Sequence, residues 1–183
     1  MSALEASPPQ AEKESEHNTI LIAVDKSTHS DYAFDYYMSN IHRPEDTILL
    51  IHCFEAHQVA AQMSGGGLGP SALGPLPADH YKGLVEEQKS NMKNLEHHYQ
   101  EKMRKQDFPV KHKFHVIEHG NSPGSSIVLA AESAKASLIV MGTRGLDLLR
   151  RTILGSVSDY VVHHAGTPVL ICHDYRHEKK HKH

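Results

Sequence analysis

The sequence predicts a single-domain α/β protein with an open, Rossmann-like, five-stranded parallel sheet covered by helices on both faces. Short apolar runs alternate with segments of helical spacing along the chain, and this alternation is typical of parallel sheets with right-handed crossovers. The first run, residues 18–25, is apolar almost throughout, as expected of a strand buried on both faces. A chain of 183 residues is long enough for one such core and too short for two ordinary domains with tails.

The first half of the chain predicts two strands separated by one helix. After the strand at residues 18–25, helical spacing predicts a helix over residues 30–41 that ends ahead of Pro44. The side chains expected on its buried face are Ala33, Tyr36, Tyr37 and Ile41. A second apolar strand is expected over residues 47–54. Residues 55–79 are rich in Gly and Pro, and they predict a long mobile insertion that could lie over a neighbouring site.

The middle of the chain continues the alternation. Residues 80–105 carry apolar side chains at three- and four-residue steps amid many charges, which predicts a long amphipathic helix with one buried stripe. Histidines and lysines interrupt the strand expected over residues 110–118, so an edge position is expected for it. Ser122 and Pro123 fit the cap and first turn of a further helix. Its buried stripe is expected to contain Ile127, Ala130, Ala131 and Ala134.

The most informative pattern is a loop that joins a strand over residues 138–141 to a helix over residues 156–164. Its glycines are Gly142, Gly145 and Gly155. Glycines let backbone N–H groups approach a ligand, and the start of the helix adds further donors and the Ser156 hydroxyl. A glycine after a strand often only forms a turn, and a serine before a helix is usually a cap, but their coincidence favours a phosphate site. Neither a P-loop nor a dinucleotide fingerprint is present.

Composition and charge exclude several classes of partner. The 19 Lys and Arg residues are dispersed along most of the chain, and the net charge is −3, so a nucleic-acid surface is not expected. Nothing approaches the roughly 18 apolar residues needed to span a bilayer. Residues 1–17 are polar and acidic and lack the features of a signal peptide, so we expect a disordered N-terminal arm on a cytoplasmic protein.

Cysteine and histidine usage predicts neither a disulfide nor a metal site. Cys53 and Cys172 lie in apolar, strand-like runs, and we expect reduced thiols in the core. Histidine is abundant, with 17 copies, several of them in the His- and Lys-rich tail at residues 175–183. The irregular spacing in that tail indicates a solvated end rather than a set of metal ligands.

On its motifs, the chain resembles the universal stress protein family over residues 18–173. The resemblance rests on LIAVD at 21–25, LIVMGTRG at 138–145, LGSVS at 154–158 and TPVLI at 167–171. The glycine spacing is that of the family's ATP-binding branch. The resemblance implies a domain over about residues 18–174, the strand order 3-2-1-4-5, and ATP at the carboxyl ends of strands one and four. Mg²⁺ or Mn²⁺ would bridge the phosphates without a dedicated protein cage.

The resemblance also implies a set of site residues. Asp25 matches the carboxylate near adenine and ribose, although a strand-end Asp often only caps the turn that follows it. Ala23, Val24 and Cys53 would line the adenine pocket, with Cys53 where the family usually has valine. The ribose and phosphate segment would comprise Met141, Gly142, Thr143, Arg144, Gly145, Gly155, Ser156, Val157 and Ser158.

Two arginines inside the nine-residue spacer stay open to either of two interpretations. Arg150 and Arg151 could pair with phosphate oxygens, or they could lie on a solvated turn. Replacing Gly142 or Gly155 by Val is expected to weaken ATP binding at least about tenfold, with folding largely retained.

The function implied by the resemblance is that of an ATP-binding stress-response protein, in which the nucleotide regulates conformation or dimerisation. The motifs provide no identifiable general base, so at most slow hydrolysis is expected. One alternative is an ATP-hydrolysing or nucleotidyl-transfer enzyme that uses Ser156, His52 or Asp25 together with a partner. The other is a nucleotide-free interaction protein.

The last strand, expected over residues 167–172, suggests self-association. Val169, Leu170 and Ile171 would form an exposed apolar edge in a monomer, and a two-fold dimer would cover it. Family members commonly pair through this strand. The alternative is coverage by the N-terminal arm or the C-terminal tail.

Overall fold

The computed structural model describes residues 18–55, 78–107, 109–119, 122–143 and 154–173. Within them, the strands are β1 (Thr19–Ala23), β2 (Thr47–Glu55), β3 (Lys111–His119), β4 (Leu138–Gly142) and β5 (Val169–Cys172). The helices are α1 (Thr28–Asn40), α3 (Ala78–Arg104), α4 (Pro123–Ser133) and α5 (Ser156–His164). The strands form one parallel sheet in the order β3-β2-β1-β4-β5. The expected fold class and strand order are therefore confirmed.

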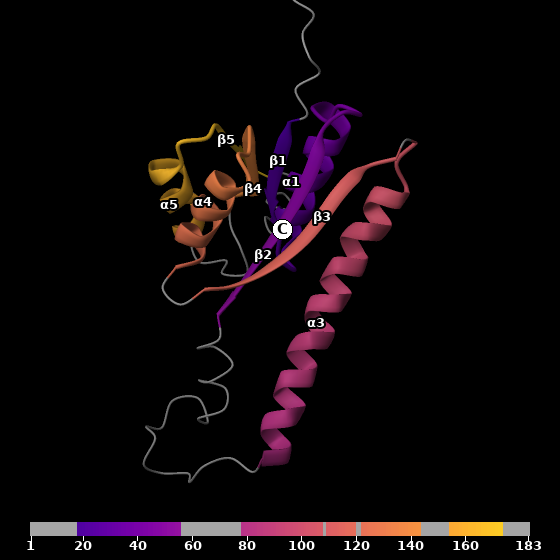
Figure 1. The fold of residues 1–183 in the computed structure, drawn as a ribbon, viewed down its shortest axis with the longest axis vertical. Coiled ribbons are helices and arrows are strands. Elements are labelled where there is room, and N and C mark those ends of the chain that lie inside the picture. Colours follow the sequence, from indigo (N-terminus) through magenta and orange to yellow (C-terminus); the bar gives the residue numbers. More distant parts are fainter. Residues whose placement is uncertain (1–17, 56–77, 108, 120–121, 144–153, 174–183) are drawn as a thin grey trace, which may run out of the picture.

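Helices cover both faces of this sheet. Alternate residues of a strand point to opposite faces, so Ile20 and Ile22 pack on one side of β1 and Leu21 on the other. The first side is covered by α1 and α3, and the second by α4 and α5. Figure 1 shows α3 as a long helix on the β3 side of the molecule, away from α4 and α5, which lie together near β4 and β5.

The buried stripe of α1 differs from the expected one. Tyr36 and Ile41 are each 39% exposed, whereas Phe34 is fully buried and Met38 is 6% exposed. The expected and observed stripes both satisfy a period of 3.6 residues, and the observed one places the aromatic ring of Phe34 in the core. The buried residues of α1 are Ser30, Ala33, Phe34, Tyr37 and Met38.

Helix α3 packs by a single stripe, as expected. Leu95, Tyr99 and Met103 are its buried residues within the core on the α1 face. Among the described strands, β3 pairs only with β2 and so lies at an edge of the sheet, as the interrupted pattern indicated. Its exposed lysines, Lys111 and Lys113, are of the kind that discourages edge-to-edge pairing.

The start of α4 departs from expectation in one detail. Ser122 occupies the N-cap position, but its side chain makes no capping hydrogen bond. Instead its carbonyl accepts hydrogen bonds from the hydroxyls of Ser125, at 2.8 Å, and Ser126, at 3.3 Å. Pro123 is the first helical residue, as expected.

Three expected segments fall mostly or wholly outside the described residues. These are the N-terminal arm at 1–17, most of the insertion at 55–79, and the tail at 175–183. Of the insertion, the described part gives Glu55 to β2 and residues 78–79 to α3. Among the described helices, none combines the length and apolar character that a bilayer crossing requires.

Candidate functional site

The candidate site lies where the order of the strands reverses. From β1 the chain proceeds outward to β2 and β3, and it then returns to place β4 and β5 on the other side of β1. In open α/β sheets, ligands bind beyond the carboxyl ends of the strands at such a switch point. Ile22 of β1 pairs with Val140 of β4, so the segments following the two strands, which begin at Val24 and Thr143, leave the sheet side by side.

Asp25 follows β1 and organises the turn into α1. Its Oδ1 accepts a hydrogen bond from the N–H of Ser27 at 2.8 Å, and its own N–H donates to the hydroxyl of Ser30 at 3.0 Å. Ser27 then caps α1, because its hydroxyl accepts from the N–H of Ser30 at 3.2 Å. The turn-capping role left open for Asp25 is thus observed for one of its carboxylate oxygens.

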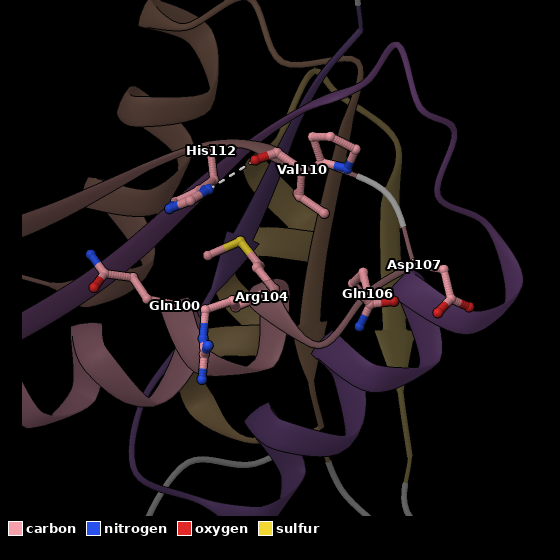
Figure 2. A pocket seen from close by; sticks show the side chains of 8 residues that line it. Gln100, Arg104, Gln106, Asp107, Val110 and His112 are labelled. Atoms are coloured by element: carbon pink, nitrogen blue, oxygen red, sulfur yellow. Dashed lines mark hydrogen bonds between the residues drawn. The ribbon is translucent and has the colours of Figure 1, made fainter.

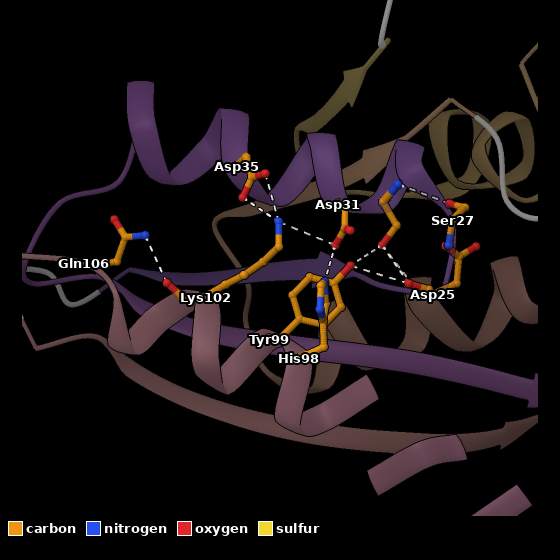
Figure 3. Close-up of polar contacts among 9 residues, drawn as sticks. Asp25, Ser27, Asp31, Asp35, His98, Tyr99, Lys102 and Gln106 are labelled. Atoms are coloured by element: carbon orange, nitrogen blue, oxygen red, sulfur yellow. Dashed lines mark hydrogen bonds and ion pairs between the residues drawn. The ribbon is translucent and has the colours of Figure 1, made fainter. Parts of the chain in front are cut away.

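A buried tyrosine from α3 reaches the same turn, and the sequence had indicated it only as part of an apolar stripe. The Tyr99 hydroxyl lies 2.6 Å from the Ser30 hydroxyl. It also lies 3.5 Å from the Asp25 carbonyl, and Figure 3 shows these two residues together. Burial is the main cause that raises the pKa of Tyr99 well above its usual value, so the hydroxyl stays protonated.

Hydrogen bonds connect β2 to the residue that follows β1. The N–H of Val24 donates to the Ile51 carbonyl at 2.8 Å, and Nδ1 of His52 lies 2.9 Å from the Val24 carbonyl. Because a carbonyl can only accept, Nδ1 of His52 carries the proton in this contact. The Cys53 thiol lies 3.8 Å from the Pro123 carbonyl, and burial raises its pKa to about 11.

The end of β4 is built by close backbone packing. Met141 is 5% exposed and belongs to the core on the α4 and α5 face. Gly142 lies against the first turn of α1, where a Cβ would come within 2.8 Å of the His29 backbone. Thr143 is bonded through its N–H to the Cys172 carbonyl at 3.1 Å, and its hydroxyl lies 3.2 Å from Nδ1 of His173.

Hydrogen bonds join the two ends of the glycine loop. The N–H of Gly155 donates to the Thr143 carbonyl at 2.8 Å. The Ser158 hydroxyl, in a residue that is 2% exposed, lies 3.0 Å from that carbonyl and 2.9 Å from the Gly155 carbonyl. The end of β4 and the start of α5 therefore lie next to each other. The spacer residues Arg144, Gly145, Arg150 and Arg151 lie outside the described residues.

The expected serines and valine at the start of α5 have different environments. Gly155 is the N-cap of α5, and Ser156 is its first residue, with an exposed side chain. Val157 is half-buried and packs against the core, while Ser158 points inward to the loop ends. The first-turn N–H groups of a helix favour anions, and α5 begins directly beside the end of β4.

A separate groove lies at the β3 edge of the sheet. Figure 2 shows it between the end of α3 and the residues before β3, with Arg104 and His112 among its lining side chains. Val110, which also lines it, comes just before β3 begins, so the groove is at the amino ends of the strands. Among the described residues, no group of three or more His, Cys, Asp or Glu side chains is placed to hold a metal ion.

Comparison with known proteins identifies relatives over most of the chain. The model of the universal stress protein family matches residues 16–173. Universal stress protein PHOS34 of Arabidopsis thaliana is 27% identical over 159 residues, and the match covers 82% of this chain but only 59% of that protein's length. Universal stress protein Sll1388 of Synechocystis sp. is 25% identical over 157 residues, covering 85% of this chain and 97% of the relative.

Solved structures share the fold. A universal stress protein family protein from Arabidopsis thaliana, solved with AMP bound, matches with a TM-score of 0.56 at 16% identity. The match covers 88% of this chain and 94% of that one. At this identity the likeness supports the architecture of the sheet and its helices.

Proposed function

This chain belongs to the universal stress protein family, and on that basis we propose that it binds an adenine nucleotide, ATP foremost, at the carboxyl ends of β1 and β4. The observation that carries the proposal is the closure of the glycine loop: Gly155 and Ser158 bind back to the Thr143 carbonyl, beside the end of β1. This closure places the first turn of α5 next to the switch point, where its N–H donors suit a phosphate.

The residues proposed for the nucleotide fall into two groups. The first group would face adenine and ribose from the ends of β1 and β2, and it contains Ala23, Val24, Asp25 and Cys53. The second group would face ribose and the phosphates, and it contains Gly142, Thr143, Arg144, Gly145, Gly155 and Ser156. Met141, Val157 and Ser158 would support this segment from beneath, because Met141 and Val157 pack in the core and Ser158 bonds to backbone carbonyls. Mg²⁺ or Mn²⁺ would accompany ATP on its phosphate oxygens.

We propose that the nucleotide regulates conformation or self-association and is turned over slowly if at all. A related protein of the same fold has been solved with AMP bound, which supports an adenine nucleotide site. The enzyme alternative would require a base near the phosphates. His52, the candidate, has Nδ1 directed to the Val24 carbonyl, which favours a role in holding the end of β1.

Calorimetric titration with ATP and AMP tests the proposal. The unmodified protein should bind one nucleotide per chain. Asp25→Asn keeps an oxygen for the Ser27 N–H but removes the charge, and it should weaken binding at least about tenfold with little change in stability. Asp107→Asn is the matched control, because Asp107 is exposed near the groove at the other edge of the sheet.

Two results would contradict the proposal. One is a protein that carries no co-purifying nucleotide in native mass spectrometry and gives no binding at millimolar ATP. The other concerns turnover: phosphate release on the order of 1 s⁻¹ or faster is in the range of ordinary kinases and would support the enzyme alternative. If His52→Ala abolished that release and left affinity intact, His52 would gain a catalytic role.

The proposed self-association uses β5, the other edge of the sheet. Val169, Leu170 and Ile171 of β5 are half-buried, and among the described strands β5 pairs only with β4. A second copy of β5 would continue the sheet across a two-fold axis. Sedimentation that gave a monomer of about 20.4 kDa at every concentration would reject the dimer.

A further inference from the structure

Helix α3 is connected to the candidate nucleotide site by a chain of buried hydroxyl groups. Tyr99 is fully buried and Ser30 is 4% exposed, and their hydroxyl oxygens are 2.6 Å apart. Ser30 in turn accepts from the N–H of Asp25 at 3.0 Å and lies 3.4 Å from the Asp25 carbonyl. The N–H of Asp25 is therefore bonded to Ser30, and the Asp25 carbonyl lies within reach of both hydroxyls, those of Ser30 and Tyr99. Figure 3 shows Tyr99 directed toward Asp25.

The protons in this network can be counted. Each hydroxyl has one proton, and the Asp25 carbonyl can only accept. If Tyr99 donates to Ser30, then the Ser30 proton is available for the Asp25 carbonyl. If Ser30 donates to Tyr99, the Tyr99 proton is available for that carbonyl, at 3.5 Å. In both arrangements Tyr99 and Ser30 each use their single proton, and Asp25 is bonded through both its N–H and its carbonyl.

The network lies inside an apolar core, where its loss is costly. The Tyr99 ring packs edge-on against Phe34 at 5.1 Å, within the cluster that fills the α1 face of the sheet. A hydroxyl in such surroundings loses its water and needs a protein partner. Replacing Tyr99 by Phe would preserve the ring packing and remove only the hydroxyl.

Polar and charged side chains also connect α3 to α1 beside this network. Nε2 of His98 lies 2.7 Å from Asp31, and the Lys102 ammonium lies 2.8 Å from Asp35 and 3.6 Å from Asp31. Asp31 follows Ser30 in the sequence, and His98 precedes Tyr99. These contacts between α3 and α1 thus lie next to the place where the buried hydroxyls meet.

We propose that Tyr99 is a positioning residue for the nucleotide site: it acts through Ser30 to hold the backbone of Asp25, so that docking of α3 and binding of the nucleotide are coupled. The inference rests on the proposed function, because it assumes that Asp25 faces the nucleotide. Coupling is reciprocal. A nucleotide that binds the ordered form of Asp25 must also stabilise the docked form of α3.

Two tyrosine-to-phenylalanine variants test this with a matched pair. Tyr99→Phe removes the hydroxyl bonded to Ser30, and Tyr37→Phe removes a hydroxyl that is also fully buried but bonds to Asp46 at 2.8 Å. Each variant loses the hydrogen bonds of one buried hydroxyl, so both should be less stable. Only Tyr99→Phe should weaken ATP binding, by about three- to tenfold. Adding Ser30→Ala to Tyr99→Phe should cost less than the two separate losses combined, because both act on Asp25.

Hydrogen exchange supplies a second measurement. ATP should slow exchange across residues 95–103 of α3 in the unmodified protein, and this protection should shrink in Tyr99→Phe. Without nucleotide, the Asp25 amide should exchange faster in Tyr99→Phe than in Tyr37→Phe. Unchanged affinity in Tyr99→Phe, or an equal loss in both variants, would overturn the inference. If the unmodified protein bound no nucleotide, the proposed function would fail, and exchange at Asp25 would decide separately whether Tyr99 orders that residue.

Discussion

Gly142 and His29 meet across the junction between the end of β4 and the first turn of α1. A Cβ on Gly142 would lie 2.8 Å from the carbonyl carbon and oxygen of His29 and 2.9 Å from its Cβ. Two of these three atoms are backbone, so the clash could not be relieved by turning a side chain. The sequence explained Gly142 by the access that it gives to a ligand, and the structure adds that α1 can approach β4 only because this side chain is absent.

Gly142→Ala is therefore expected to destabilise the fold, by about 1–3 kcal/mol, because α1 must shift on the sheet. Gly142→Val should cost more. For Gly142, this replaces the expectation that folding would largely survive the change to valine, because that expectation considered only the ligand. Equilibrium unfolding in denaturant measures the loss.

Gly83→Ala is the control for that measurement. Gly83 lies in α3, and a Cβ there would meet nothing within 4 Å. Alanine favours a helix over glycine by about 0.5–1 kcal/mol, so this variant should be slightly more stable than the unmodified protein. Equal effects from the two substitutions would argue against the steric explanation.

Ser156 and Ser158, two residues apart at the start of α5, should respond differently to replacement by alanine. The Ser158 hydroxyl is buried and joins the Thr143 and Gly155 carbonyls, so Ser158→Ala should lower stability by about 1 kcal/mol. The Ser156 side chain is exposed, so Ser156→Ala should leave stability unchanged and weaken ATP binding. Thermal unfolding and calorimetric titration of both variants check this. A loss of stability in Ser156→Ala alone would contradict it.

The sequence predicted the layout of the sheet because strand burial and helix spacing are local signals. The runs at residues 18–25 and 138–141 lie within about two residues of β1 and β4, and the helix expected over 156–164 has the observed bounds of α5. Periodicity could not choose between Phe34 and Tyr36 for the buried face of α1. Both choices satisfy the same period, and the observed face places Phe34 against Tyr99 of α3, a helix far along the chain.

The sequence indicated where the candidate site would lie, but it did not indicate the contacts inside it. Asp25 and the glycines mark the strand ends through short motifs, which are visible in one sequence. The bond between Ser30 and Tyr99 joins residues 69 positions apart, and no local pattern distinguishes that tyrosine from an ordinary core residue. Ser158 could likewise be placed in the motif, but its inward direction depends on where Thr143 and Gly155 meet.

Both cysteines should be poorly reactive in the folded protein. They are free thiols, and burial raises the pKa of each to about 11. Since the thiolate is the reactive form, little of either thiol is ionised near pH 7.5. Reaction with a disulfide reagent should be slow at that pH, faster as the pH rises toward 11, and rapid in denaturant. Rapid labelling of the native protein at pH 7.5 would contradict the placement of Cys53, which is half-buried, and of Cys172, which is buried.

His42 should make stability fall as the solution becomes acidic. Its side chain is fully buried, and burial lowers its pKa, with Asp46 and Glu45 acting in the opposite direction. The folded state therefore favours the neutral ring, while the unfolded chain takes up a proton near its usual pKa of about 6.5. The stability that neutral His42 contributes is present above about pH 6.5 and is lost as the pH falls below it, by at most about 1.4 kcal/mol per pH unit.

Comparison of pH dependence in two variants isolates this contribution among the 17 histidines. The free energy of unfolding is measured at pH 7.5 and 5.5 for the unmodified protein, for His42→Gln and for His97→Gln, whose ring is exposed on α3. His42→Gln should lose less stability between the two pH values than the unmodified protein, because its side chain does not titrate. His97→Gln should follow the unmodified protein. The quantity to compare is the change in the free energy of unfolding between the two pH values, not its absolute size. Glutamine also changes the packing against Tyr37, whose ring lies 5.7 Å from that of His42. If all three proteins lost the same free energy of unfolding between pH 7.5 and 5.5, burial of His42 would not be the cause of the loss of stability in acid.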